Sequence, residues 1–535
     1  MIRYKKLKEQ VFKNRLMNSK FLLVLIIIVA FAVRLYRIDS PVADWHSWRQ
    51  ADTSAVTRNF SKFGFNPLFP RYDDLSNIQT GVDNPEGYRF VEFPVYQSFV
   101  FMLSKLAAPL PISLEVWHRI VSILASLGSL YLIYELGKRY ANERVGLISA
   151  GFYAILPYSI YYSRVILPEV FLGFFMLLTL YLFSKAIVPV NPSEIQHSFA
   201  SLISFLFPKK SLSVRSVAVY PEFLLASAIS AALALLIKPV SIFFLLPIIY
   251  FWFQYLLFSR KYVLYGITYL LIMVVPLVAW RLWIQQFPEG IPAWTWLLNG
   301  DQVPYNNLKL SEWIYHPLGI RFKGAFFRWL FAERLTKLIL GYSGVAFLVL
   351  GILAKKGIKQ KLFFHMLGLG ALLYITVFAG GNVRHDYYQV ITLPIVVLYA
   401  GMGVDFLLTN RNRLFDSIST YAMIVVLVGF TLAFSWFEIR GYYWINNPAI
   451  VEAGIQADQL LPEQAKVIAP YGGDTAFLYQ INRQGWPIGF EIEDKIAKGA
   501  THYVSVSPQD PEALDLKERY TVLAETDSYI IINLQ

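Results

Sequence analysis

The sequence predicts an all-α polytopic membrane bundle of about 11 spans plus interfacial helices, followed by a small C-terminal α/β domain. Three observations predict this fold class. Of the 535 residues, 56% are hydrophobic and only 16% are charged, whereas soluble domains carry about 25% charged residues. Apolar runs of about 18 or more residues recur along the chain, as is typical of transmembrane helices. Basic clusters follow alternate runs, and this alternation indicates the topology.

Charge and cysteine content exclude several function classes. The formal net charge is +12, but the Lys and Arg excess lies in short loops beside apolar runs, so it indicates membrane orientation rather than nucleic-acid binding. The chain has no cysteine, which excludes disulfides, a thiol nucleophile and Cys-ligated metals. The first apolar run lacks a small-residue cleavage site, so we expect an anchor and not a removed signal peptide.

The N-terminal segment 1–20 is strongly basic, and we place it in the cytoplasm. The first span, Phe21–Leu35, then leads outward into a large outer loop, 38–117. The next basic turn, at 138–144, should again be cytoplasmic, so the chain must cross the membrane once between these points.

Two stretches compete for that crossing, Val95–Leu110 and His118–Leu136. The first is short, contains Lys105 and is bounded by prolines. We therefore expect it to be an interfacial helix on the outer face. The second stretch then crosses inward, which keeps the later basic clusters on the cytoplasmic side.

The remaining crossings alternate outward and inward, and a second large outer loop, 281–337, follows the seventh span. With this parity the basic clusters at 209–215 and 355–361 are cytoplasmic. These later spans are Val145–Pro157, Val170–Ile187, Phe223–Ile237, Val240–Phe258, Tyr262–Trp280, Leu338–Ala354, Leu362–Ala379, Val390–Leu408 and Tyr421–Phe437.

The last segment, 440–535, is polar enough to be a soluble extracytoplasmic α/β domain after the membrane domain, 21–439. Pro448–Leu461 has the pattern of a helix. Short apolar runs predict strands at Lys466–Pro470, His502–Val506 and Tyr529–Asn533.

The first outer loop carries the densest set of chemically useful side chains, which includes Asp44, His46, Arg49 and Asp52. A carboxylate can take a proton from an attacking hydroxyl, and a guanidinium can clamp a phosphate with two hydrogen bonds. The neighbouring tryptophans could stack on a sugar or simply anchor an interfacial helix. Asp44 and Asp52 are both candidates for the base.

Further ionisable or polar side chains lie at the outer ends of later spans, where such groups are costly and often functional. Polar loops beside a bilayer and a snorkelling Lys238 are the simpler interpretations. A His next to an Asp, as at 385–386, is a weak metal or phosphate signal alone. The candidates are Glu92, Arg164, Glu169, Lys238, Arg384, His385 and Tyr388.

Over about residues 15–440, the order of these motifs resembles the membrane glycosyltransferases of the GT-C fold. The most similar groups are the protein O-mannosyltransferases and the bacterial lipid A aminoarabinose transferases. The segments that carry the resemblance are His118-Arg119 through Gly137-Lys138-Arg139, Arg164 to Glu169, Lys238-Pro239, and Arg384 to Tyr388.

The chain also departs from the pattern of these enzymes, which usually carry Asp-Glu early in the first outer loop. Here Asp44 is followed by Trp45, and Asp52 is followed by Thr53. Their Lys-Pro-Pro element reads Glu92-Phe93-Pro94. The chain therefore resembles an uncharacterised branch with a His-x-Trp-Arg-Gln-x-Asp-Thr signature, in which Asp52 is the first choice for the base and Asp44 the second.

The resemblance implies a glycosyltransferase of the cell (inner) membrane that moves a hexose or pentose from a polyprenyl-phosphate donor to a lipid, glycan or protein acceptor. Transfer would be inverting and extracytoplasmic, with Asp as general base. Arg49, Lys238 and Arg384 would bind the donor phosphate. The substrate-orienting residues would be His46, Glu92, Arg164, Glu169, His385 and Tyr388, and Glu92 and His385 could hold Mg or Mn.

Two other function classes remain open. The first is a transporter or flippase for a lipid or glycolipid, although the chain shows no inverted repeat and few ionisable residues deep within its spans. The second is a binding protein whose C-terminal domain docks a partner of the cell envelope.

Overall fold

The computed structural model describes residues 19–108, 110–189, 217–255, 260–293, 295, 319–354 and 362–535. Three features of the sequence analysis lie wholly or mostly outside the described residues. They are the basic N-terminus up to residue 18, the basic clusters at 209–215 and 355–361, and the part of the second outer loop at 296–318.

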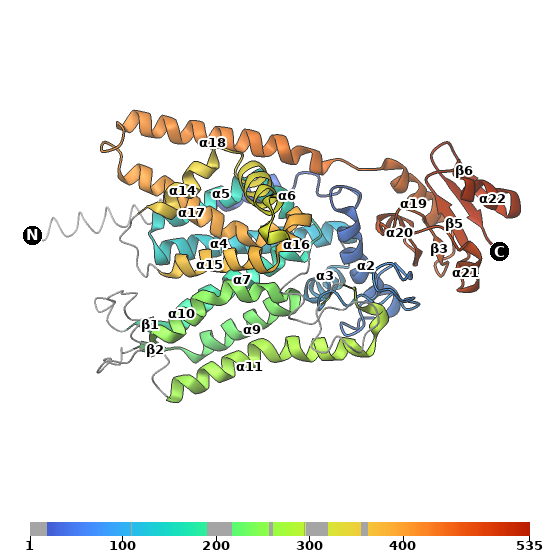
Figure 1. The fold of residues 1–535 in the computed structure, drawn as a ribbon, viewed down its shortest axis with the longest axis horizontal. Coiled ribbons are helices and arrows are strands. Elements are labelled where there is room, and N and C mark those ends of the chain that lie inside the picture. Colours follow the sequence, from blue (N-terminus) through green and yellow to red (C-terminus); the bar gives the residue numbers. More distant parts are fainter. Residues whose placement is uncertain are drawn as a thin grey trace, which may run out of the picture.

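Helices occupy every apolar stretch that was assigned to a span. They pack as a bundle whose long members run side by side (Figure 1). They are residues 19–34, α4 (Leu114–Tyr140), α5 (Glu143–Ile155), α7 (Pro168–Ala186), α9 (Pro221–Ile237), α10 (Leu246–Tyr255), α11 (Arg260–Trp283), α14 (Gly344–Leu353), α15 (Leu362–Val377), α17 (Leu393–Thr409) and α18 (Ser417–Ile439).

Among the described residues, five helical stretches are long and apolar enough to cross a membrane. A sixth span results if a bent pair, Gly324–Ile339 with Gly344–Leu353, is counted as one. The chain is thus a multi-pass membrane protein, and the figure of about 11 crossings stays a prediction. The five stretches are Leu114–Tyr140, Pro168–Ala186, Tyr262–Gln286, Asp386–Thr409 and Ser417–Leu460.

The eighth predicted span, Leu338–Ala354, differs from the structure at its start. A π-helix, η7 (Arg328–Ile339), precedes α14, and the chain turns by 116° between them. Gly341 and Tyr342 both have positive φ at this bend. A Cβ on Gly341 would lie 2.1 Å from the Thr431 carbonyl oxygen, so the close approach of α18 requires glycine here.

Two 3₁₀ segments place polar side chains at one end of the bundle. Lys238 lies in extended backbone between α9 and η2 (Pro239–Leu245), because the residue before a proline is held out of the helical region. Asp386 begins η8 (Asp386–Thr392), which leads into α17.

The first outer loop folds against this same end of the bundle. It contains α2 (Ser47–Phe63) and α3 (Val95–Leu106), which pack on each other. The Tyr96 hydroxyl of α3 donates to the His118 carbonyl oxygen at 2.8 Å and thereby ties α3 to the start of α4. A helix was predicted here, and its interfacial position stays a prediction.

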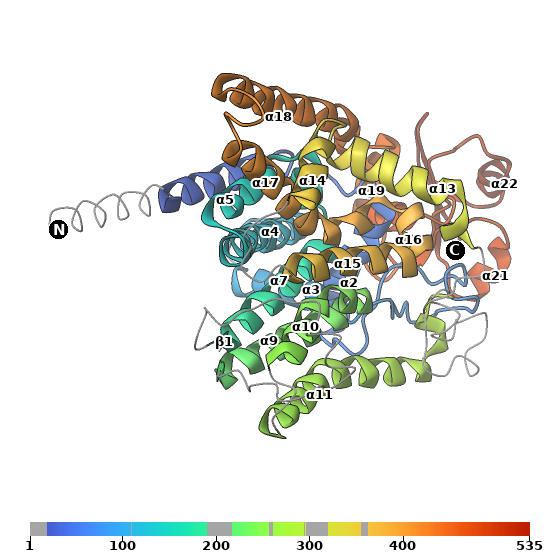
Figure 2. The ribbon, with the colours of Figure 1, turned by 60° about the vertical axis from the view of Figure 1, so that its left-hand side comes forward.

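The two ends of the bundle carry different parts of the chain. The antiparallel pair of β1 (Ile187–Pro189) and β2 (Val217–Val219) lies at one end with the turn between α17 and α18 (Figure 1). The first outer loop and the C-terminal domain lie at the other end, as the second view also shows (Figure 2).

The C-terminal domain is built on a five-stranded mixed sheet with the order β4-β3-β5-β7-β6. The three predicted strands are present as β3 (Val467–Ile468), β5 (His502–Ser505) and β7 (Ile530–Asn533). The unpredicted members are β4 (Gly485–Trp486) and β6 (Thr521–Glu525), and the helices are α19 (Pro448–Leu460), α20 (Ala476–Ile481), α21 (Ile492–Ala497) and α22 (Pro511–Arg519).

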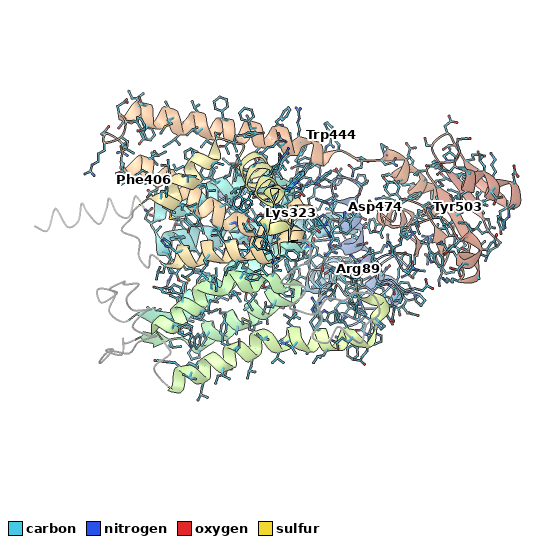
Figure 3. The ribbon with its side chains drawn as sticks, in the orientation of Figure 1. Arg89, Lys323, Phe406, Trp444, Asp474 and Tyr503 are labelled. Atoms are coloured by element: carbon cyan, nitrogen blue, oxygen red, sulfur yellow. The ribbon has the colours of Figure 1, made fainter. Side chains whose placement is uncertain are left out.

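This domain docks directly on the first outer loop. Asp74 pairs with Gly485 in a parallel bridge, so the loop extends the edge of the sheet next to β4. The Tyr479 hydroxyl donates to Glu115 at 2.5 Å, and the Gln480 amide donates to the Val42 carbonyl oxygen at 3.0 Å. Figure 3 shows Arg89 and Asp474 where the bundle and the domain meet.

Candidate active site

A cavity of about 360 Å³ lies at the end of the bundle that carries the first outer loop. Its walls come from that loop, the α9–η2 junction, the end of α11, and the segment from α15 to η8, which includes α16 (Ala379–Arg384). Six of the predicted site residues line it: Arg49, Glu92, Lys238, Arg384, His385 and Tyr388.

Arg49 and Glu92 form a buried ion pair in this wall. Arg49 lies in the first turn of α2, and one of its guanidinium nitrogens contacts both Glu92 carboxylate oxygens, at 2.6 and 2.8 Å. Burial opposes ionisation of Glu92, but Arg49, Lys238 and Arg89 together hold its pKa below the ordinary value. Glu92 is therefore charged and holds Arg49 in place.

Lys238 and the buried Glu169 form a second ion pair, in which the Lys238 side chain is 12% exposed. Glu169 lies in the first turn of α7, directly after Pro168, and accepts from the Lys238 ammonium. That ammonium also lies 4.6 Å from the centre of the Tyr388 ring. Lys238 thus lines the cavity from an extended residue and has Glu169 as its partner.

Asp44 lies outside the cavity lining and is fully buried. It accepts from Arg164 at 2.9 Å and from the Gln50 side-chain amide at 2.5 Å. Gln50 in turn accepts from the Ile166 backbone N–H at 3.2 Å. This network joins the start of α2 to the turn that precedes α7.

Asp52 also lies behind the cavity wall, with only 1% of its surface exposed. It contacts Arg89 at 2.6 Å, and Arg89 does line the cavity. Its other oxygen accepts from the Thr475 hydroxyl of the C-terminal domain at 2.6 Å. Burial raises the pKa of Asp52, and Arg89 and the Thr475 hydrogen bond offset this only in part.

His46 does not line the cavity but anchors a polar network beside it. Its imidazole lies 2.6 Å from Asp386. Asp386 also accepts from the Tyr162 hydroxyl at 2.6 Å and from the Tyr442 hydroxyl at 2.5 Å. Asp386 therefore connects the first outer loop, the segment before α7 and the 3₁₀ segment Arg440–Tyr443 that follows α18.

The His385 ring lies close to the first outer loop. Its centre is 5.9 Å from the ring centre of Trp48 and 5.9 Å from that of His46. Burial lowers the pKa of His385 to about 4, with a further contribution from His46. The imidazole is therefore neutral near pH 7.

The residues present do not fit the divalent cation that was considered for Glu92 and His385. Across the part of the chain that the structure describes, no three His, Asp or Glu side chains are grouped as metal ligands. Both oxygens of Glu92 already accept from Arg49. We assign no chemical step to a metal.

Two basic residues of the cavity, Arg89 and Arg281, were missing from the predicted site. Arg281 lies in the last turn of α11, directly after the predicted outer end of the span Tyr262–Trp280, where basic residues run against the positive-inside trend. That exception was a usable signal. No such signal marks Arg89 in the sequence, because its partner Asp52 belongs to another segment of the loop and the pairing depends on the fold.

Comparisons with known proteins agree with this architecture. Residues 99–205 match the family model described as dolichyl-phosphate-mannose-protein mannosyltransferase. No curated protein sequence matches the chain.

Solved structures match nearly the whole chain at low identity. ArnT from Cupriavidus metallidurans, bound to undecaprenyl phosphate, has a TM-score of 0.59 at 13% identity, covering 95% of this chain and 97% of that one. AglB from Archaeoglobus fulgidus is an oligosaccharyltransferase solved with an inhibitory peptide and a dolichol-phosphate. Its TM-score is 0.51 at 11% identity, and the match covers 96% of this chain and 74% of that one. The mycobacterial arabinofuranosyltransferase AftD has a TM-score of 0.54 at 12% identity, and the match covers 96% of this chain and 40% of that one. The chain shares the fold of these enzymes, which confirms the GT-C resemblance.

Proposed function

We propose that this protein transfers a sugar from a polyprenyl-phosphate donor to an acceptor hydroxyl on the extracytoplasmic face of the membrane, with inversion. The single observation that carries the proposal is the convergence of basic side chains in one cavity. Four separate segments of the chain contribute them, namely Arg49 and Arg89 from the first outer loop, then Lys238, Arg281 and Arg384.

Such a cluster suits a phosphate that leaves during the reaction. Positive groups fixed in advance stabilise the charge that develops on the leaving oxygen. Glu92 and Glu169 neutralise only part of this charge and hold Arg49 and Lys238 in place. A polyprenyl phosphate is already a good leaving group, so the site needs no general acid. The bound undecaprenyl phosphate and dolichol-phosphate of ArnT and AglB support a lipid phosphate as the ligand.

The cavity lining also includes apolar side chains, as the first units of a prenyl tail require. Burial of such a chain against apolar side chains would contribute about 25 cal/mol of binding free energy per Å² of apolar surface removed from water. These apolar lining residues are Val91, Ile237, Pro239, Val240, Val377 and Phe378.

We propose Asp52 as the general base, with Asp44 as the second choice. Asp52 is one contact removed from the cavity, because Arg89 lies between them. A donor phosphate that attracts Arg89 would release one Asp52 oxygen to accept the proton of an acceptor hydroxyl. Asp44 is held on both sides by Arg164 and Gln50, so we expect it to position the loop.

The test is a transfer assay with a radiolabelled polyprenyl-phosphate sugar and membranes that contain the protein. Asp52→Asn should lower turnover at least about a hundredfold, since general bases contribute on the order of 10² to 10⁴. Asp527→Asn, in the exposed turn before β7, is the matched control and should leave turnover unchanged. Unchanged turnover in both Asp52→Asn and Asp44→Asn would reject the assignment of the base.

A further inference from the structure

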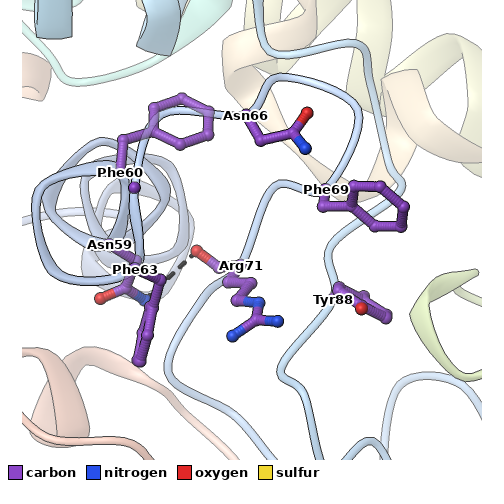
Figure 4. Close-up of a pocket in the computed structure, with 8 residues that line it drawn as sticks. Asn59, Phe60, Phe63, Asn66, Phe69, Arg71 and Tyr88 are labelled. Carbon is purple, nitrogen blue, oxygen red and sulfur yellow. Dashed lines mark hydrogen bonds between the residues drawn. The ribbon is translucent and has the colours of Figure 1, made fainter.

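A second cavity, of about 280 Å³, opens on the first outer loop beyond the cavity described above. Phe60 and Phe63 of α2 lie on one side of it, and Phe69 and Tyr88 lie on the other, with Arg71 between them (Figure 4). Asn59, Gly64 and Asn66 complete the lining. Aromatic faces combined with amide groups are the side chains that bind sugars, because the C–H face of a sugar packs on a ring while its hydroxyls form hydrogen bonds.

Asn59 lies beneath one wall of this cavity. Its side chain is only 2% exposed, and its amide nitrogen donates to the Arg71 carbonyl oxygen and to Asp73, both at 3.2 Å. These two bonds fix which end of the amide is the oxygen. That oxygen, Oδ1, is buried without a hydrogen-bond partner. This oxygen is out of reach of a ligand, so the Asn59 amide serves to hold the Arg71 backbone in the cavity wall. The exposed Asn66 is the lining amide that a ligand hydroxyl can reach.

The charge of the cavity favours a neutral ligand over an anion. The only basic side chain in the lining is Arg71, and it already pairs with Glu86 at 2.5 Å. Its guanidinium also lies 5.1 Å from the centre of the Phe63 ring and 5.5 Å from that of Tyr88. A phosphate would meet an Arg71 whose charge Glu86 already neutralises.

The position of this cavity relates it to the proposed reaction. Asn59 lies seven residues after Asp52 on the same helix, which is two turns or about 10 Å along the same face. Tyr88 lines this cavity, and the next residue, Arg89, lines the other. The two cavities are therefore neighbours along α2.

We infer that this second cavity binds a neutral sugar residue of the acceptor, so that the acceptor of the proposed transferase is a glycan. The role of this sugar as part of the acceptor rests on the proposed function, but the binding of a saccharide in this cavity does not. A non-reacting sugar held here would direct a neighbouring sugar hydroxyl toward Asp52. Such remote binding lowers the KM for the acceptor and orients it.

Saturation-transfer difference NMR on the full-length protein in lipid nanodiscs tests the inference without a donor. The probes are maltotriose, mannotriose, chitotriose and, for comparison, inorganic phosphate. The wild-type protein should give signals with at least one trisaccharide. Phe63→Ala should weaken that binding at least about fivefold, because a stacked ring is lost, and Phe63→Trp should retain it. Phe63 is 49% exposed, so its replacement leaves the core intact.

Phe65→Ala is the matched control, since Phe65 is 41% exposed in the same loop but does not line the cavity. It should bind the saccharide like the wild type. Lys238→Met should abolish transfer and keep saccharide binding, which separates this inference from the proposed function. Absence of saccharide signals in the wild type, equal weakening in Phe63→Ala and Phe65→Ala, or binding of phosphate alone would overturn the inference.

Discussion

Lys238 and Glu169 show what a single residue type can and cannot indicate. An ionisable side chain at a span end is costly, so the sequence could mark both as functional candidates. Their pairing could not be predicted, because 69 positions separate them and the contact depends on how α7 and α9 pack. The same limit applies to Asp52 and Arg89. Sequence reasoning thus found six residues of the cavity but not the ion pairs that orient them.

Asp74, which joins the first outer loop to the C-terminal sheet, should make stability depend on pH. It is fully buried, and burial raises its pKa from 3.8 to about 7, although hydrogen bonds with Ser76 oppose this. Because the pKa of Asp74 is higher in the folded state than in the unfolded state, protonated Asp74 stabilises the fold below about pH 4. This contribution is lost as the pH rises to about 7. The free energy of unfolding should therefore fall over this window and level off above it.

Thermal unfolding in detergent between pH 4 and pH 8 measures this effect. Asp74→Asn should flatten the pH dependence, because the amide does not titrate. Asp527→Asn changes an exposed carboxylate of the same type and should leave the slope as in the wild type. The same slope in Asp74→Asn and in the wild type would show that Asp74 does not titrate with folding.

The helices of the bundle were predictable as elements because an apolar run of sufficient length has few alternatives. The structure departs from the sequence analysis where tertiary contacts decide. The π-helix η7 and the bend before α14 depend on the approach of α18 at Gly341. Strand β4 has only two residues, and β6 lies at the sheet edge with alternating exposure, so neither gives a strong local pattern.

The packing of α14 against α17 gives a prediction for this scale. A Cβ on Gly403 of α17 would lie 1.9 Å from the Phe347 carbonyl oxygen of α14. Gly403→Ala should therefore force the helices apart and lower the free energy of unfolding by about 1 to 3 kcal/mol or more.

Thermal unfolding of the purified protein checks this value. Gly429→Ala is the matched control, because a Cβ at this position of α18 meets nothing within 4 Å. It should be neutral or slightly stabilising. Equal stability of Gly403→Ala and Gly429→Ala would contradict the close approach of α14 and α17.

At the scale of the whole molecule, the account depends on the two ends of the bundle facing different compartments. The alternation of basic clusters predicted this arrangement, and the structure gathers the acidic and basic site residues at one end. The absolute orientation is a prediction from the positive-inside rule. How the C-terminal domain docks could not be predicted, since Thr475 and Gly485 meet the loop only in the folded chain.

Cysteine labelling tests the orientation, because the chain has no cysteine of its own. A cysteine at Phe490, which is 74% exposed in the C-terminal domain, should react with a membrane-impermeant maleimide in cells with a permeabilised outer envelope and an intact inner membrane. A cysteine at Leu414, which is 52% exposed in the turn between α17 and α18, should react only after the inner membrane is disrupted. The reverse pattern would invert the proposed topology.

The central claim is that the basic cavity binds the phosphate of a lipid donor, and native mass spectrometry with added undecaprenyl phosphate tests it most directly. Lys238→Met removes a cation that lines the cavity, whereas Arg413→Met removes an exposed cation at the other end of the bundle. The account predicts a bound lipid phosphate in the wild type and in Arg413→Met, with occupancy at least about tenfold lower in Lys238→Met, as expected for the loss of one charge-assisted contact. Equal occupancy in the two variants would contradict it.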